Sequence, residues 1–331
     1  MSKEQSAIIK GFAILFVFIA HLGCIHGIQG LDNYIADSLE ATSQQAVFFF
    51  LVVSGYGLYY VYHQGRMTWS YLFKRTLKLY LAYWLILLIF VFGIASWLYP
   101  ERYHYPWHAV LLNFLGWRWD YCKFTWFLLP YILMCLSARW IIRVFDRIGI
   151  VFSLIGALAL YMAGSFLVSY YYDPWLRSHY VVYHLILWVR TLLGFTVGAS
   201  MARRVFEGKS IVWSKLKGKN AVVALLLVLT IGVRGLMPSA ALNPFHATLL
   251  IWLLLHFDGN GLIKKVVVEL GDKCMILWLA QGFLGVYLFS EYLVQLRWPL
   301  LIYIVWVMVT YAVACLLKPV INSLAKALRL T

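Results

Sequence analysis

Residues 11–21 read GFAILFVFIAH, an apolar run that Lys10 precedes and His21 closes. With its flanking residues the run is about 20 residues long, enough for a helix to span the ~30 Å hydrocarbon core of a bilayer. Similar runs recur along the whole chain, in which 63% of the 331 residues are hydrophobic and 12% are charged. The runs lack the alternation of membrane β-strands. We therefore expect an all-α, polytopic integral membrane protein, because helices satisfy their own backbone polar groups in lipid.

The apolar runs predict about ten transmembrane helices in one membrane domain, residues 1–331, with no appended soluble domain. Lys and Arg near helix ends stay on the cytoplasmic side. With both termini in the cytoplasm, 21 of the 28 basic residues fall on that side. This topology and contact with anionic lipids account for the net charge of +15, so no nucleic-acid partner is expected. The expected spans are residues 6–27, 44–62, 77–99, 124–142, 148–169, 181–202, 221–237, 244–257, 272–290 and 299–317.

Lys10 and His21 lie on one face of the first expected helix. They are 11 residues apart, which is about three full turns and about 16 Å along the axis. Taken alone, Lys10 can be a lysine at a helix end whose side chain extends to the membrane interface. Taken alone, His21 can be a packed histidine bonded to a neighbouring carbonyl. Taken together they favour a path lined by one helix face, because ionisable residues within a span usually face a cavity or a partner.

The next two spans contribute further polar groups. Residues 47–60, VFFFLVVSGYGLYY, place Ser54, Gly55 and Tyr56 within the membrane, where small residues allow close helix approach. Arg75 and Lys78 stand three apart at the cytosolic start of the third span and share a helix face. Two explanations fit this pair equally well. One is anchoring by the positive-inside rule, and the other is a docking site for a phosphorylated cytosolic substrate, which fixed cations favour.

These stretches, in this order, resemble the membrane-bound acyltransferase family 3, polytopic enzymes that O-acylate extracytoplasmic glycans and related acceptors. The family pattern begins with a basic residue, usually Arg, then ten residues and a histidine; here Lys10 replaces the Arg before His21. An aromatic-rich segment ending in Ser-Gly-Tyr follows, here FFFLVVSGY (48–56), and then a basic pair, here Arg75 and Lys78.

A fainter similarity lies in LGDKCMILWLAQG, residues 270–282, which looks like a late family helix that usually ends in His; here the residue is Gln281. The resemblance implies an acyl-CoA donor whose phosphates rest on Arg75 and Lys78 and whose pantetheine arm passes Lys10. It implies no tightly bound cofactor and no metal.

On the acceptor side, the resemblance implies that His21 acts as general base on a hydroxyl that arrives from outside. Ser54 and Tyr56, with Gly55 between them, are candidate substrate-binding residues that donate hydrogen bonds to the developing oxyanion. Arg190 lies near the middle of the sixth expected span, where a charge is costly, so we expect it to be paired or to bind substrate.

Two outer segments, residues 103–126 and 170–175, are rich in aromatic side chains. Anchoring at the membrane interface explains them, and stacking against a sugar is the alternative.

We therefore predict an acyl-CoA-dependent O-acyltransferase of the bacterial inner membrane. It moves an acyl group, with acetyl favoured, from cytosolic acetyl-CoA to a hydroxyl of an extracytoplasmic sugar or lipid-linked glycan such as a polysaccharide. The alternative is a transporter or flippase for a polyprenyl-linked or small polar substrate. Transporters often carry inverted repeats and broken helix pairs, and neither is apparent in this sequence. The expected partners are the donor, the acceptor and membrane lipids.

Overall fold

The protein is described by a computed structural model that covers residues 1–28, 30–31, 33–103, 106–173, 175–237, 239–257 and 261–330. Helices account for 81% of the residues, and no strand occurs in these ranges. The expected all-α fold is therefore confirmed.

The long helices follow the apolar runs, and two of them continue directly into π-helical segments. The principal helices are α1 (Lys3–Leu22), α2 (Asn33–Ser43), α3 (Ala46–His63), α4 (Trp69–Leu87), α6 (Trp107–Phe114), α7 (Leu128–Tyr171), α8 (Tyr180–Phe206), α9 (Asn220–Leu236), α10 (Asn243–Leu254), α11 (Leu262–Gly282) and α13 (Pro299–Ala327). The short ones are α5 (Ser96–Leu98), α12 (Ser290–Val294), the π-helical η1 (Leu88–Ala95) and η6 (Phe283–Tyr287), and the 3₁₀ turns η2 (Lys123–Thr125), η3 (Leu176–Ser178), η4 (Ser214–Leu216) and η5 (Ala240–Leu242).

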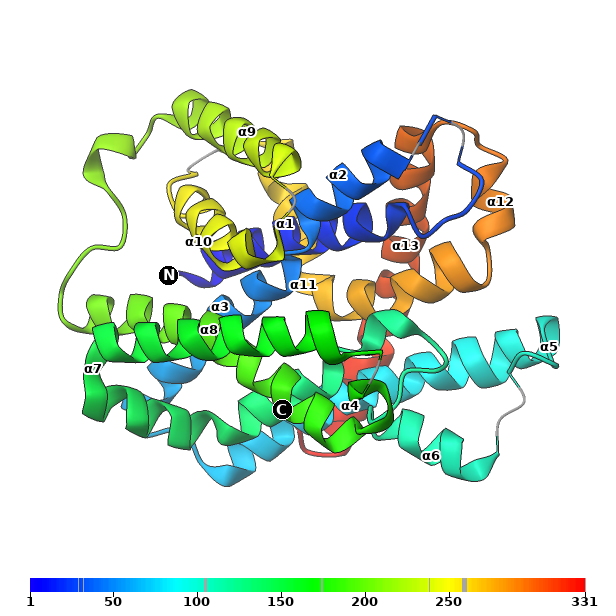
Figure 1. Cartoon of the computed structure of the whole chain (residues 1–331), viewed down its shortest axis with the longest axis horizontal. Helices are drawn as coiled ribbons and strands as arrows, with labels where there is room; N and C mark the ends of the chain where they lie inside the picture. The colour runs from blue at the N-terminus through cyan, green and yellow to red at the C-terminus, as the bar shows by residue number, and fades with distance from the viewer. Residues whose placement is uncertain are drawn as a thin grey trace.

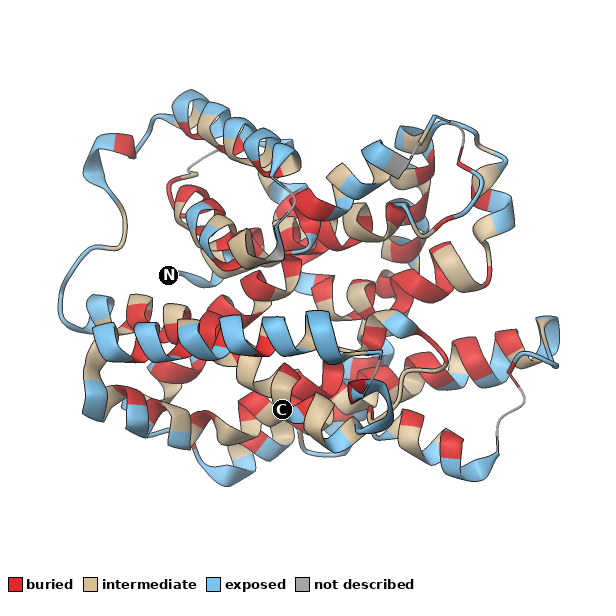
Figure 2. Ribbon diagram, in the orientation of Figure 1, coloured by how far each residue is buried: buried red, intermediate tan, exposed pale blue. Residues whose placement is uncertain are grey.

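Helix α1 lies at the centre of the molecule. It contacts α2, α3, α10, α11 and α13, while α8 packs against both α7 and α3 (Figure 1). Buried residues gather where α1, α3 and α11 cross, and exposed residues run along α7 and α9 (Figure 2). Many of the exposed residues are large and apolar, for example Phe152 on α7 and Val228 on α9. Such an outer surface suits contact with lipid rather than water.

Helix α7 is two helices joined at a bend. Gly149, with φ of 82° and ψ of 172°, departs from helical geometry inside its 44 residues. A glycine tolerates this left-handed φ because it has no Cβ. The bend falls at the start of the expected span 148–169, close to its expected boundary with the span 124–142.

Within the described ranges, six helical stretches are long and apolar enough to cross a membrane. Helices α9 and α10 are apolar but shorter. The first twelve residues of α11 carry five charged side chains, those of Lys264, Lys265, Glu269, Asp272 and Lys273. Each of the ten expected spans overlaps a helix, but the number of crossings and the location of the termini stay predictions. The six stretches are Lys3–Leu22, Tyr34–His63, Trp69–Leu98, Lys123–Tyr171, Tyr180–Phe206 and Pro299–Ala327.

Glycines bring the central helices into close contact. A Cβ on Gly11 would overlap the backbone of Val267 in α11, and one on Gly271 would overlap the backbone of Ala7 in α1. In the same way, a Cβ on Gly55 of α3 would overlap the backbone of Phe195 in α8. Small residues at a crossing let helix backbones approach closely, as they do in membrane proteins generally. These two crossings fix α1 against α11 and α3 against α8, and thereby position the site residues.

Candidate active site

His21 occupies the last turn of α1 and is half-buried. Its ring lies against that of Phe124, with the centroids 3.8 Å apart and the planes at 30°. Its Nδ1 atom is buried and has no hydrogen-bond partner among the described residues. A histidine held by ring contacts, with one nitrogen unbonded, retains the capacity to accept a proton from an incoming hydroxyl.

The side chain of Gln281, near the end of α11, lies beside His21. It is fully buried, and its Oε1 and Nε2 atoms both lack a regular hydrogen bond within the described part of the chain. Its backbone carbonyl accepts a hydrogen bond from Trp306 Nε1 at 2.9 Å, which fixes this turn of α11. The structure thus brings together the first and last motifs of the sequence. Buried amides without a regular partner are uncommon, and this one lies beside the imidazole of His21.

A π-helical segment begins two residues after Gln281. In η6, Phe283 stacks on Phe90 of the other π-helical segment, η1, at 5.6 Å and an interplanar angle of 8°. Such π-helical turns often occur at functional sites. Their irregular backbone was not predicted from the sequence.

Lys10 lies 11 residues before His21 on α1 and is half-buried. It is close enough to Asp272 and Cys274 of α11 to influence both electrostatically. No hydrogen bond or ion pair engages Lys10 in the ranges that the structure describes. Because Lys10 pairs with the middle of α11 and His21 with Gln281 near its end, the two helices run in the same direction. Lys10 and His21 therefore both lie along the interface between α1 and α11.

Ser54 and Arg75 meet through a residue that the motifs did not include, Tyr131 of α7. The Tyr131 hydroxyl lies 2.8 Å from Ser54 Oγ and accepts a hydrogen bond from Arg75 Nη2 at 3.0 Å. Arg75 Nη2 also donates to Ser54 Oγ at 3.5 Å. Arg75 therefore turns inward from the start of α4 instead of extending to the surface. The sequence offered little to identify Tyr131, which is a single hydroxyl in an apolar span.

The three residues of the Ser-Gly-Tyr motif have different surroundings. Ser54 belongs to the cluster with Arg75, whereas Gly55 packs on the backbone of α8. The hydroxyl of Tyr56 accepts a hydrogen bond from the amino group of Met1 at 2.6 Å. The structure therefore gives Gly55 a role in helix contact, and a substrate contact at Gly55 stays a prediction.

Ser54 and His21 lie at different depths. Phe16 of α1 packs edge-on against Phe49 of α3, at 5.9 Å between ring centroids. Met1 contacts Tyr56, so the two helices are antiparallel, and Ser54 lies level with the segment of α1 between Met1 and Phe16. Ser54 is thus nearer to Lys10 than to His21. The predicted role of Ser54 and Tyr56 as oxyanion donors for chemistry at His21 does not fit this placement.

Lys78 lies one turn beyond Arg75 on α4 and is half-buried. It makes no ion pair or hydrogen bond in the described ranges. The sequence predicted that Arg75 and Lys78 act together on a phosphate. In the structure the two differ, because Arg75 is hydrogen-bonded inside the protein whereas Lys78 has no such bond in the described ranges.

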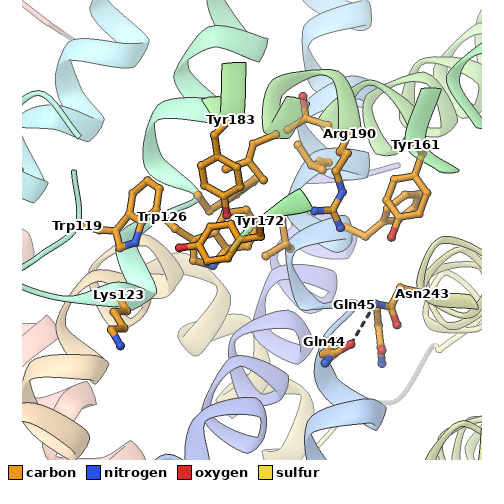
Figure 3. A pocket seen from close by; sticks show the side chains of 16 residues that line it. Gln44, Gln45, Trp119, Lys123, Trp126, Tyr161, Tyr172, Tyr183, Arg190 and Asn243 are labelled. Atoms are coloured by element: carbon orange, nitrogen blue, oxygen red, sulfur yellow. Dashed lines mark hydrogen bonds between the residues drawn. The ribbon is translucent and has the colours of Figure 1, made fainter. Parts of the chain in front are cut away.

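Arg190 of α8 lines a cavity of about 370 Å³ (Figure 3). Its guanidinium lies over the ring of Tyr161, 5.5 Å from the centroid, and its Nε is buried without a partner among the described residues. Trp119 and Trp126 of one aromatic outer segment and Tyr172 of the other line the same cavity. The two aromatic segments are thus brought together around Arg190.

The cavity and His21 are linked by the turn η2. Lys123 lines the cavity, and the next residue, Phe124, contacts the ring of His21. The backbone carbonyl of Phe124 accepts a hydrogen bond from Trp278 of α11 at 3.2 Å. His21 is not one of the cavity's lining residues, so the turn separates the two.

The fold and this arrangement of polar groups within apolar helices define a polytopic membrane protein with a buried histidine site. A family model described as an acyltransferase domain, that of acyltransferase family 3, matches residues 7–318. Because the match covers nearly the whole chain, this protein belongs to acyltransferase family 3, and it is an acyltransferase. No curated protein and no solved structure matches the chain significantly.

Proposed function

We propose that this protein transfers an acyl group, acetyl in the simplest case, from cytosolic acyl-CoA to a hydroxyl of an extracytoplasmic sugar or lipid-linked glycan. The observation that carries the proposal is the position of His21. It lies at the end of α1 beside the buried amide of Gln281, with Lys10 about 16 Å away on the same helix. Membership of the acyltransferase family makes transfer, rather than transport, the chemistry to assign to these residues.

In the proposed reaction His21 accepts the proton of the acceptor hydroxyl while the oxygen attacks the thioester carbonyl. The carbon–sulfur bond then breaks, and the departing CoA thiolate takes the proton from the imidazolium. The Nε2 amide of Gln281 is a buried donor beside His21. It takes the oxyanion-stabilising role that the sequence suggested for Ser54 and Tyr56, since a positioned donor there stabilises the charge that develops on the carbonyl oxygen.

The donor half of the proposed site contains Lys10, Arg75 and Lys78. Arg75 uses one nitrogen to bond Tyr131 and Ser54, which holds the guanidinium in one orientation and leaves its other donors for a phosphate. Lys78 adds an unpaired charge one turn away. In the predicted topology, Lys10 lies between this pair and His21 along the membrane normal. A cation there can attract the polar pantetheine arm or the thioester.

We further propose a bacterial inner-membrane location with ten crossings and both termini in the cytoplasm, as the basic residues suggest. Reporter fusions after Arg147 and Lys219 should then report cytosol, and fusions at Asp173 and Ser239 the outside. Two neighbouring fusions in the same compartment would remove a crossing and contradict this topology.

The proposed activity is tested with membrane vesicles of the producing cell that receive labelled acetyl-CoA on their cytosolic face. Alkali-labile label should appear on sugar exposed on the opposite face, since an O-acetyl ester is cleaved by mild base. Vesicles that bind acetyl-CoA but transfer label only to water or to protein would contradict glycan acylation. Undetectable binding of acyl-CoA to folded protein would contradict the donor.

A further inference from the structure

The basic residues outside the cytoplasmic set are not scattered. In the predicted topology, seven of the 28 Lys and Arg residues fall on the outer side or within the membrane. These are Arg102, Arg118, Lys123, Arg177, Arg190, Arg234 and Arg297. Four of the seven, Arg118, Lys123, Arg177 and Arg190, line the Arg190 cavity or an adjoining one of about 510 Å³. Topology does not require cations on this side, so their gathering calls for another cause.

The two cavities form one acceptor-side basin, because Trp119, Lys123, Tyr172 and Tyr183 line both. Figure 3 shows these rings facing the space in front of Arg190, with Lys123 at the opposite end. Gln44 and Asn243, which line the far wall, are joined by a long hydrogen bond of 3.5 Å. The basin therefore combines aromatic faces, amides and cations.

The charges in the basin are unbalanced. Asp120 is the one acidic residue in either lining, and it is already bonded to Arg118 at 2.9 Å and to Asn113 at 2.8 Å. Lys123, Arg177 and Arg190 make no ion pair with any residue in the described ranges. The guanidinium of Arg190 lies over an aromatic face, and its Nε is buried without a partner among the described residues. Three unpaired cations are left for a ligand.

We infer that this basin binds a sugar that carries an acidic group, either a carboxylate of a uronic acid or a phosphate next to the sugar. Arg190 recognises the acidic group, because its planar fork matches carboxylate and phosphate oxygens. The indole and phenol rings stack on the apolar faces of the sugar, and Lys123 extends the positive field toward the turn that contacts His21. The inference rests on the proposed function in that it names the acceptor class of the same enzyme.

Binding is measured by calorimetry on the purified protein in bilayer discs of neutral lipid, without acyl-CoA. The probes are a galacturonic acid trimer, its fully methyl-esterified form and glucose 1-phosphate. The trimer differs from its ester in charge, so a preference for the acid reports the cations. The variants are Arg190→Gln and Lys123→Gln, with Arg297→Gln as the matched control, since Arg297 is an exposed outer cation that does not line the basin.

We expect the acid trimer or the sugar phosphate to bind at least about tenfold more tightly than the neutral ester, the effect of one charge-assisted hydrogen bond. Arg190→Gln should remove this preference and Lys123→Gln should reduce it, while Arg297→Gln keeps it. Preference for the trimer identifies a carboxylate as the acidic group, and preference for glucose 1-phosphate identifies a phosphate. Equal binding of charged and neutral probes, or a preference indifferent to both basin variants, overturns the inference. Lys123 is exposed, so its variant tests the idea even where Arg190→Gln does not fold.

The outcome is separable from that of the proposed function. Charge-dependent binding in a protein that transfers no acyl group would sustain the basin and refute the activity. Acyl transfer to neutral sugars at equal rates in the parent and in Arg190→Gln would sustain the activity and refute the basin.

Discussion

Gly55 of the Ser-Gly-Tyr motif and Gly57, two residues further along α3, should respond in opposite ways to the same substitution. An alanine Cβ at position 55 would lie 2.8 Å from the carbonyl carbon of Phe195 and 2.9 Å from its Cα, and closer still to the carbonyl oxygen. These are backbone atoms of α8 and cannot rotate away. A Cβ at position 57 would have no atom within 4 Å.

The magnitudes follow from these contacts. Replacing glycine by alanine within a helix contributes about 1 kcal/mol of stability through propensity. Overpacking costs about 1–3 kcal/mol, and overlap with a backbone places Gly55→Ala near the upper end. We therefore expect Gly55→Ala to lose about 2 kcal/mol and Gly57→Ala to gain up to about 1 kcal/mol.

The assay is thermal unfolding of the purified variants in detergent, followed by tryptophan fluorescence. Gly55→Ala should unfold several degrees below the parent and Gly57→Ala at or above it. Equal unfolding temperatures for the two variants would refute the helix-contact role. A Gly55→Ala protein of normal stability that fails to bind acyl-CoA would instead support the substrate contact that the motif suggested.

The donor half yields three further predictions. Arg75→Gln combined with Lys78→Gln should weaken acyl-CoA binding at least about tenfold. It should also flatten the salt dependence of binding, because salt screens the attraction between these cations and the CoA phosphates. Binding indifferent to both changes would contradict the phosphate site. Tyr131→Phe should weaken acyl-CoA binding by a smaller factor, about fivefold, because it removes one hydroxyl that orients Arg75, worth about 1 kcal/mol. Calorimetry of Tyr131→Phe alone and combined with Arg75→Gln shows whether Tyr131 acts through Arg75. Lys10→Arg should retain activity, since Arg is the usual residue in the family pattern, whereas Lys10→Met should lower turnover more than donor affinity; a Lys10→Met enzyme with parental turnover would remove Lys10 from the reaction.

The helical fold was predictable because each apolar run is long enough to decide its own structure. Gly149 illustrates how far this goes, since the apolar runs predicted the spans 124–142 and 148–169 and the structure has a glycine with positive φ close to their boundary. The short helices α2 and α6 and the π-helical segments were not predicted. Their form depends on contacts such as that of Phe90 with Phe283, which local hydropathy does not encode.

The candidate site was predictable in part. The face shared by Lys10 and His21 follows from helix periodicity alone, and the faint late motif led to Gln281, which the structure places beside His21. Tyr131 was missed because a single tyrosine in an apolar run has no signature until α3, α4 and α7 are brought together. The inward orientation of Arg75 was missed for the same reason.

The cavity around Arg190 was also not predictable from the sequence. Each aromatic outer segment was explained equally well by membrane anchoring. Only the assembled structure shows that Trp119, Trp126 and Tyr172 surround one space together with Arg190. Contacts between distant segments carry this information, and one sequence without its fold does not.

The central claim, that His21 is the general base, is tested most directly by measuring acetyl transfer in vesicles that contain the parent, His21→Ala or His26→Ala. His26 is an exposed histidine five residues further along and serves as the matched control. General base catalysis contributes about 10²–10⁴-fold, so His21→Ala should lose at least about 99% of the transfer rate at a normal unfolding temperature, and His26→Ala should match the parent. A folded His21→Ala protein that keeps more than about a tenth of parental activity, far above this range, would contradict the account.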